Sequence, residues 1–364
     1  IGSTSSSSDN TDAAVVPLLS VPAKPRHPVE VHYLEDLLRC DGAEEHHDEC
    51  TIRTDDSTTF SLSPKAQKFA SSLLQYSDDQ LQREYEKMTN DIAFASSSSS
   101  SLNEENSISD TERMVNLKKA LAMRKESSSS LSSPLPYFDY KKFDFKATMT
   151  GLISEIAFQL CHTKTEDATG NNSSSRSTIG SILCFLPGMD EIKACTKYIE
   201  EQCSRSSGGS SQLRNRIQII QLHSTIPQDD QQKVFEPAET YTAVAADGTL
   251  QQRPKIKLIF ATNIAESSIT IDDVIAVIDS GLVREMNFDA NTVVDTTETN
   301  PISQASATQR LGRCGRVGPG QCYRLFSSSD LEANILKDRP IPEIQRTSLE
   351  ATCLQTCSMM MNNN

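Results

Sequence analysis

The sequence predicts an α/β fold in which helices flank a doubly wound, mostly parallel sheet. Short apolar or β-branched runs recur from residue 181 onward, and a helical pattern or a turn separates each run from the next. The run SILCFL at Ser181–Leu186 is continuously apolar and too short for a buried helix, which is typical of a parallel strand covered on both faces. Strands and helices that alternate at this spacing form a sheet with right-handed crossovers.

Each predicted element follows from its local pattern. The segment VEVHYL at 29–34 is β-branched and aromatic, and it predicts the first strand. A helical repeat of apolar residues begins near Ser61, and Ala147–Cys161 is expected to form an amphipathic helix. Further strands are expected at 181–186, 217–222, 255–261, 275–279 and 321–326, further helices at 111–125, 189–203, 227–235 and 309–316, and a loop at 241–254.

Two extended segments, about Val283–Asn287 and Thr292–Thr297, predict a projecting β-hairpin, although the strong Asn-Gly turn signal is missing. Its expected tip is the tetrapeptide Phe288, Asp289, Ala290 and Asn291. Such a hairpin is either a structural addition or a wedge, and the sequence alone leaves both interpretations open.

Serine-rich tracts divide the chain. Residues 1–27 are rich in Ser, Asp and Thr and are expected to form a flexible lead. Residues 28–328 form the predicted domain. Within it, the serine-rich and partly helical segment 60–135 is interpreted as a mobile, disordered insert outside the core. Residues 329–364 are expected to be a linker and the beginning of a further domain.

The composition limits the classes of function. A net charge of -14 argues against sequence-independent electrostatic coating of nucleic acid and leaves room for a local basic groove. No apolar run approaches the about 20 residues of a membrane span. Ten cysteines without a CxxC pair are interpreted as reduced thiols of the cytoplasm or nucleus, the cytoplasm being slightly favoured. His46, His47 and Cys50 lie in an acidic loop and are interpreted as solvated, so no metal site is expected.

The segment QRLGRCGR, which begins at Gln309, concentrates arginine. On a helix with about 100° per residue, Gln309, Arg313 and Arg316 share one narrow face, and Arg310 lies to one side. No acidic residue occurs between residues 301 and 329. Because a guanidinium matches phosphate in two-point contacts, this unpaired cluster predicts an anionic ligand, and a solvated basic helix is the alternative.

Small polar groups follow three of the predicted strands, where ligands of doubly wound sheets bind. They are Gly188, His223, Ser224, Thr225, Thr262, Asn263, Glu266, Ser267, Ser268, Thr270 and Asp272. Hydroxyls, amides and bare backbone donate to phosphate oxygens without crowding the chain. Routine turn or helix-cap chemistry is the alternative for each of these residues.

Four segments resemble motifs of the DEAH/DExH-box RNA helicases, in the order of that family. They are SILCFLPGMDEI from Ser181 (motif IV), LHSTIPQDDQQKVFEP from Leu222 (IVa), ATNIAESSITIDDV from Ala261 (V) and QRLGRCGRVGPGQCYRLF from Gln309 (VI). PVEVHYLED, from Pro28, resembles the strand that opens the second RecA-like domain of the family. The resemblance spans about 28–326, with the insert interrupting it, and implies a RecA-like fold.

The resemblance implies roles by position. Gln309 is expected to place the attacking water, and Arg313 and Arg316 are expected to act as arginine fingers on the γ-phosphate of ATP. The implied nucleotide-facing residues are Phe235, under the adenine, with Thr270 and Asp272. The implied contacts to the RNA backbone are Gly188, Ser224, Thr262, Asn263 and Ser268. The hairpin around 288–291 corresponds to the element thought to part the duplex.

The chain departs from the family in two ways. Cys314 replaces the usual alanine, and a thiol beside two arginines is either reactive, through a lowered pKa, or an inert core residue. No GxxxxGK[ST] loop and no DExH box occur in the 364 residues. In the family these parts hold the phosphates and Mg²⁺ and belong to the first RecA-like domain. The chain is therefore expected to be a fragment of a larger enzyme, ending where a winged-helix domain begins.

Two functions of different classes follow. The leading hypothesis is the C-terminal RecA-like half of an ATP-dependent 3′-to-5′ RNA helicase, whose partners are RNA and its own first RecA-like domain. The alternative is a catalytically inactive RNA-binding or regulatory module derived from a helicase. A DNA helicase is a further interpretation, because backbone contacts do not select the sugar.

Overall fold

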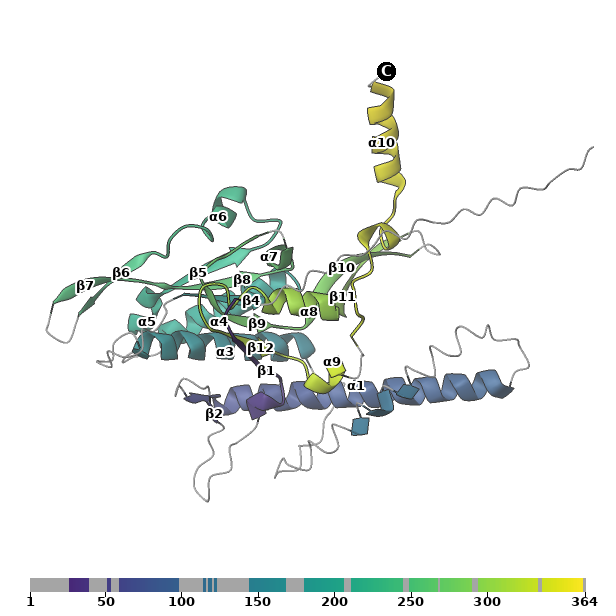
Figure 1. Cartoon of the computed structure of the whole chain (residues 1–364), viewed down its shortest axis with the longest axis horizontal. Helices are drawn as coiled ribbons and strands as arrows, with labels where there is room; N and C mark the ends of the chain where they lie inside the picture. Colours follow the sequence, from purple (N-terminus) through teal and green to yellow (C-terminus); the bar gives the residue numbers. More distant parts are fainter. Residues whose placement is uncertain are drawn as a thin grey trace, which may run out of the picture.

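Six strands form the central sheet of the chain, in the order β1-β12-β9-β4-β8-β5 (Figure 1). The computed structural model describes residues 26–38, 51–53, 59–97, 114–115, 117–119, 121–122, 144–167, 180–205, 211–244, 249–267, 269–289, 294–332 and 336–362. Every neighbouring pair of these strands is parallel, which confirms the predicted sheet. The strands are β1 (Val29–His32), β4 (Ser181–Phe185), β5 (Ile217–Leu222), β8 (Ile256–Ala261), β9 (Val274–Asp279) and β12 (Gly320–Arg324).

Helices and three two-stranded ribbons surround this sheet. The α-helices are α1 (Pro64–Ser97), α3 (Phe145–Asp167), α4 (Met189–Arg205), α5 (Ser211–Arg216), α6 (Gln228–Gln232), α7 (Ile264–Ser267), α8 (Gln304–Leu311), α9 (Ser328–Glu332) and α10 (Glu350–Asn362). The ribbons are β2–β3 (Thr51–Arg53 and Thr59–Ser61), β6–β7 (Thr240–Val244 and Leu250–Pro254) and β10–β11 (Leu282–Asp289 and Val294–Pro301). Short 3₁₀ turns lie at Asp36–Leu38 and Glu343–Gln345.

The two faces of the sheet carry separate cores. Along β4, Ile182 and Cys184 pack toward α1, α3 and α4, whereas Leu183 and Phe185 pack into a second cluster on the opposite face. This alternation with a period of two explains why the whole strand is apolar. The second face is covered by loops and short helices, so residues above it reach the surface.

Helix α3 differs from its predicted amphipathic character. Residues 148–157 are all buried, because α3 lies between the sheet and α1 (Figure 1). At Gly151 a Cβ would lie 2.6 Å from the ring of Phe69 on α1, so the absence of a side chain lets the two helices approach closely. The predicted helix is confirmed and its predicted polar face is wrong.

The first part of the expected insert belongs to the core. Five of its side chains, Leu62, Ala66, Ala70, Leu73 and Leu74, are buried in the cluster that includes α3. The expectation that 60–135 lies outside the core is therefore wrong for 62–74, since this end of α1 covers α3. Farther along, the described residues of 114–122 are helical, and Leu117 packs on Leu81. The lead 1–25 and the loop with His46 lie outside the described residues, and the domain boundaries stay predictions.

The segment 241–254 was expected to be a loop, and this is wrong. Strands β6 and β7 pair antiparallel, with Tyr241 opposite Arg253 and Thr242 opposite Gln252. The hairpin lies at the edge of the domain and exposes even Leu250, 73% of whose surface is accessible. Because Ala243 is buried while most of the other described side chains of the two strands are exposed, the sequence shows no apolar alternation that would predict strands.

The predicted β10–β11 hairpin is confirmed, with Leu282 opposite Pro301 and Asp289 opposite Val294. Phe288 and Asp289 belong to β10 and not to the turn, because the strand continues past them, while Ala290 and Asn291 lie outside the described residues. Helix α10 extends away from the sheet (Figure 1), and the predicted winged-helix start stays a prediction. No helix in the described part of the chain combines the length and apolarity that crossing a membrane requires.

Candidate functional site

The arginine segment begins on α8 and ends on a turn. Ser303 caps the helix by accepting a hydrogen bond from the Ser306 amide at 3.1 Å, and the helix ends at Leu311 with Gly312 as its C-cap. Gly315 then has a φ of +74°, a conformation that favours glycine. The predicted single helical face for Gln309, Arg313 and Arg316 is therefore wrong, because the helix stops before the second and third of these residues.

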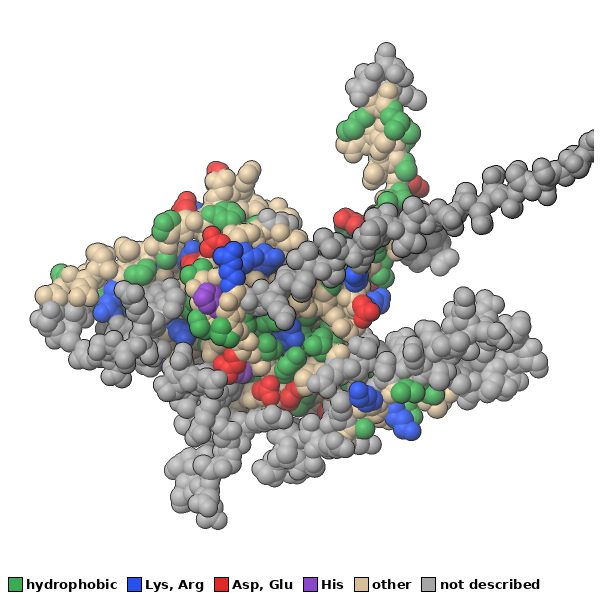
Figure 2. Space-filling model, in the orientation of Figure 1, with side chains coloured by type: hydrophobic (Ala, Val, Ile, Leu, Met, Phe, Trp, Pro, Cys, Tyr) green, Lys and Arg blue, Asp and Glu red, His purple; other side chains and the backbone are tan. Residues whose placement is uncertain are grey.

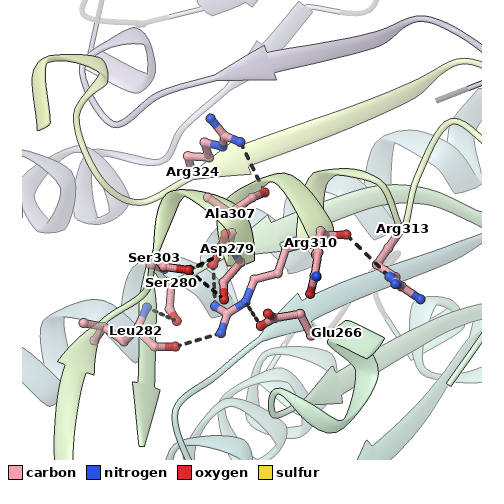
Figure 3. Close-up of polar contacts among 12 residues, drawn as sticks. Glu266, Asp279, Ser280, Leu282, Ser303, Ala307, Arg310, Arg313 and Arg324 are labelled. Carbon is pink, nitrogen blue, oxygen red and sulfur yellow. Dashed lines mark hydrogen bonds and ion pairs between the residues drawn. The ribbon is translucent and has the colours of Figure 1, made fainter. Parts of the chain in front are cut away.

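Arg310 is a buried structural cation and not part of an unpaired cluster (Figure 3). Only 1% of it is exposed, and its guanidinium pairs with Asp279 at 2.7 Å and Glu266 at 3.1 Å. It also donates to the carbonyl of Leu282 at 3.2 Å and lies 4.8 Å from the ring centre of Phe185. Arg310 thus joins α8 to α7, to the end of β9 and to the start of the hairpin.

Arg324 is also buried and bonded. One nitrogen donates to the carbonyl of Ala307 at 3.3 Å (Figure 3). Another nitrogen donates to the hydroxyl of Tyr33 at 3.0 Å. The guanidinium lies 5.6 Å from the ring centre of Phe326. Arg324 therefore bonds α8 to β12, and its guanidinium is not exposed at the surface.

Arg313 and Arg316 are half-buried on the turn after α8. Arg313 donates to the Ile269 carbonyl at 3.1 Å, which holds the turn against the segment after α7. Burial first, and the neighbouring Arg316 second, lower the pKa of Arg313. Within the described residues no carboxylate forms an ion pair with either arginine, and Gln309 is exposed at the end of α8. This turn therefore places two cations beside the surface segment that follows α7.

The predicted nucleotide-facing residues lie on the same side of the sheet. Ile269 and Ile271 pack into the second core, whereas Thr270 and Asp272, which alternate with Ile271, are exposed. Phe235 is 57% exposed and follows Val234, which is buried in the same core. All three predicted residues are thus accessible above the second face.

Buried Lys257 connects these two exposed segments, and the sequence analysis missed it. Its Nζ donates to the carbonyls of Val234 and Glu236, each at 3.2 Å, and pairs with Asp273 at 3.2 Å. The sequence did offer a signal, because the second lysine of KIKLIFA lies between apolar residues of the predicted strand. A lysine buried in this way needs hydrogen-bonding partners.

Five of the eleven predicted strand-end residues come together around one cavity of about 350 Å³, and the other described ones do not line it. Gly188, His223, Ser224, Thr262 and Asn263 line it, together with Arg284 from the hairpin. The sequence analysis missed Arg284, whose guanidinium pairs with buried Glu191 at 2.9 Å and lies where a Cβ on residue 188 would clash. Ser268, the fifth predicted RNA contact, lies outside the described residues.

Cys314 is a core residue. It is fully buried in the second core, and burial raises its pKa to about 12. The interpretation as a reactive thiol with a lowered pKa is therefore wrong, because desolvation by burial is the largest influence on this thiol and raises its pKa.

Side chains of the kinds that bind metal ions are not clustered in the described residues. These residues contain no group of three or more His, Cys, Asp or Glu side chains placed to hold a metal ion.

Figure 2 shows Lys and Arg side chains, in blue, gathered near the middle of the visible face below α6, which suits an anionic ligand.

The parallel sheet with its flanking helices is that of a RecA-like domain, and the two surface arginines and the polar strand ends lie at its surface. Residues 171–318 match the family described as the helicase conserved C-terminal domain. This part of the chain is thus similar to the C-terminal domain of helicases, in agreement with the resemblance to the DEAH/DExH-box family.

Curated relatives are helicases. The chain is 42% identical over 177 residues to the putative ATP-dependent RNA helicase DHX57 of Homo sapiens, covering 48% of this chain and 11% of that protein. It is 42% identical over 176 residues to the ATP-dependent DNA/RNA helicase DHX36 of Rattus norvegicus, covering 48% and 15%. It is 39% identical over 184 residues to the pre-mRNA-splicing factor ATP-dependent RNA helicase prp22 of Schizosaccharomyces pombe, covering 50% and 14%.

The chain therefore spans only 11% to 15% of the length of these relatives. Among solved structures, the E. coli DExH-box NTPase HrpB is similar over 57% of this chain and 20% of that one. That pair has 26% identity and a TM-score of 0.39.

Proposed function

We propose that the chain is the C-terminal RecA-like half of an ATP-dependent RNA helicase that unwinds RNA in the 3′-to-5′ direction. ATP lies between a first RecA-like domain of the same protein and the turn that carries Arg313 and Arg316. The observation that supports this best is the contrast among the arginines. Arg310 and Arg324 are buried and bonded, whereas no described carboxylate pairs with Arg313 or Arg316.

The electrostatics of the turn favour a polyanion. Burial first, and the like charge of Arg316 second, lower the pKa of Arg313, and the negative charge of a triphosphate relieves the repulsion between the two arginines. Charge on the transferred phosphoryl group must be met by preorganised cations. We assign that role to Arg313 and Arg316, and the placing of the attacking water to Gln309.

The base and ribose of the nucleotide lie against the two exposed segments of the second face. Phe235 stacks under the adenine, because an aromatic ring that is 57% exposed offers a flat apolar surface. Thr270 and Asp272 face the same nucleotide from the neighbouring segment. The relatives named ATP-dependent helicases support ATP as the substrate.

Single-stranded RNA passes over the carboxyl ends of the strands. Gly188, Ser224, Thr262 and Asn263 bind its phosphates through hydroxyl, amide and backbone donors, and Ser268 is proposed to join them. Closure on ATP and release after hydrolysis shift these contacts along the strand. The tip of the β10–β11 hairpin, Phe288 to Asn291, parts the duplex.

The remaining partners are proposed for the larger protein. Its first RecA-like domain supplies the phosphate-binding loop and mainly holds Mg²⁺. We propose the cytoplasm as the main location and the nucleus as the alternative.

The test uses a protein in which this chain is joined to its first RecA-like domain. Arg316→Ala is expected to retain RNA affinity and to reduce RNA-stimulated ATP hydrolysis about 10³-fold or more, the usual effect of removing an arginine finger. Arg205→Ala, which removes an exposed arginine from α4, is the matched control and should change neither. Unchanged turnover in Arg316→Ala would refute the assignment. RNA binding without any hydrolysis in the unmodified protein would support an inactive RNA-binding module.

A further inference from the structure

Polar side chains of β5 and β8 fasten the segment that carries Phe235 to the sheet. Gln218 accepts from the Glu239 amide at 3.0 Å, and Lys255 pairs with the carboxylate of the same residue at 2.6 Å. Both contacts lie at the far end of the segment from Phe235. The contact beside the aromatic residue comes from Lys257.

Lys257 uses all of its hydrogen-bonding capacity in one buried place. Only 4% of the residue is exposed, and Nζ has three acceptors at 3.2 Å: the carbonyls of Val234 and Glu236 and a carboxylate oxygen of Asp273. An ammonium has three N–H donors, so this set satisfies it. Removing the cation would leave two carbonyls that turn inward without a donor.

These acceptors bracket the two sides of the proposed nucleotide site. Val234 and Glu236 are the residues on either side of Phe235, and Asp273 directly follows Asp272. We propose that Lys257 is a positioning residue for nucleotide binding, which fixes the Phe235 ring relative to Asp272 and so determines how tightly the base is held. This inference rests on the proposed function.

The effect of Lys257 should depend on the base. A triphosphate without a base contacts the arginine turn, which Lys257 does not touch. Adenosine triphosphate also needs Phe235 and Asp272 at the correct separation. A purely structural role would change the affinity for both ligands or for neither.

The experiment uses the protein in which this chain is joined to its first RecA-like domain, and it measures the affinity for ATP and for inorganic triphosphate by calorimetric titration. Lys257→Met is expected to weaken ATP binding about tenfold and to change triphosphate binding by less than about twofold, because lost hydrogen bonds to a charged group free the segment. Lys255→Met, two residues earlier on the same strand, should leave both affinities within about twofold. An unchanged ratio of the two affinities in Lys257→Met would overturn the inference.

Two further variants separate the possible failures. Lys257→Arg retains a buried charge, but the planar guanidinium of arginine cannot reach three acceptors from one point. The ratio of the affinity for ATP to the affinity for triphosphate should therefore fall about threefold. If Lys257→Met does not fold, the affinity ratio of Lys257→Arg decides the question. A ratio equal to that of the unmodified protein then overturns the inference. Phe235→Ala tests the proposed function itself. If ATP binds no better than triphosphate before mutation, or if Phe235→Ala leaves the ratio unchanged, both proposals are overturned. If only Phe235→Ala lowers the ratio, the role of Lys257 alone fails.

Discussion

Replacing Arg310 with methionine should destabilise the fold more than any change to the surface arginines. Both Arg310 and its partner Asp279 are about 1% exposed, and Glu266 is 12% exposed. Methionine fills a similar volume but leaves both carboxylates without their cation. Breaking a buried ion pair from one side costs about 3–5 kcal/mol. We expect a loss of that size in the free energy of unfolding.

Urea denaturation of the chain, followed by circular dichroism, measures this loss. The free energy of unfolding is extrapolated to water, and an unchanged slope shows that the unfolded state is the same. Arg313→Met is the matched control, because this half-buried arginine has no ion-pair partner in the described residues, so its loss should cost less than about 1 kcal/mol.

A double variant tests whether the pair itself carries the effect. Asp279→Asn keeps an oxygen that can accept from the Gly281 amide, now at 2.9 Å, and removes the charge. Arg310→Met with Asp279→Asn should cost at least about 1 kcal/mol less than the sum of the single changes. A loss in Arg310→Met no larger than in Arg313→Met would refute the reasoning that a buried network holds these elements together.

Two more predictions concern the hairpin and the cysteines. Arg346 donates to the Met286 carbonyl at 3.0 Å and pairs with Glu285 at 3.5 Å. Arg346→Ala should therefore speed amide hydrogen exchange at Phe288 about tenfold. Unchanged exchange would contradict the view that Arg346 stabilises this strand. Buried Cys314, whose pKa is raised to about 12, should resist alkylation by iodoacetamide at pH 8 in the folded chain, whereas exposed Cys353 should be alkylated. Peptide mass spectrometry measures both reactions. Rapid labelling of Cys314 would contradict its burial.

Arg310 also relates the two proposed sites to each other. It lies on the helix that leads into Arg313, and it bonds the residue that starts the hairpin, Leu282. Buried polar contacts of Arg310 therefore link the helix before the arginine turn to the first residue of the hairpin.

The sequence by itself determined the parallel sheet and the residues that follow the carboxyl ends of its strands. Continuous apolar runs such as 181–186 need cover on both faces, and that local requirement is enough to predict parallel strands. The residues after those strands were found for the same reason, since parallel strands end at one edge. The motif resemblance added Phe235, Arg313 and Arg316, which composition and spacing cannot assign to a nucleotide.

Only the tertiary structure decided which arginines are available and what positions the site. The partners of Arg310 lie 31 and 44 residues away in the chain, and no local pattern announces such pairs. The same holds for Lys257, whose acceptors are mainly backbone carbonyls, and for residues 62–74, which are buried because α3 happens to lie above them. Burial and pairing depend on distant neighbours, whereas strand and helix patterns depend on adjacent residues, and this difference separates what each level could determine.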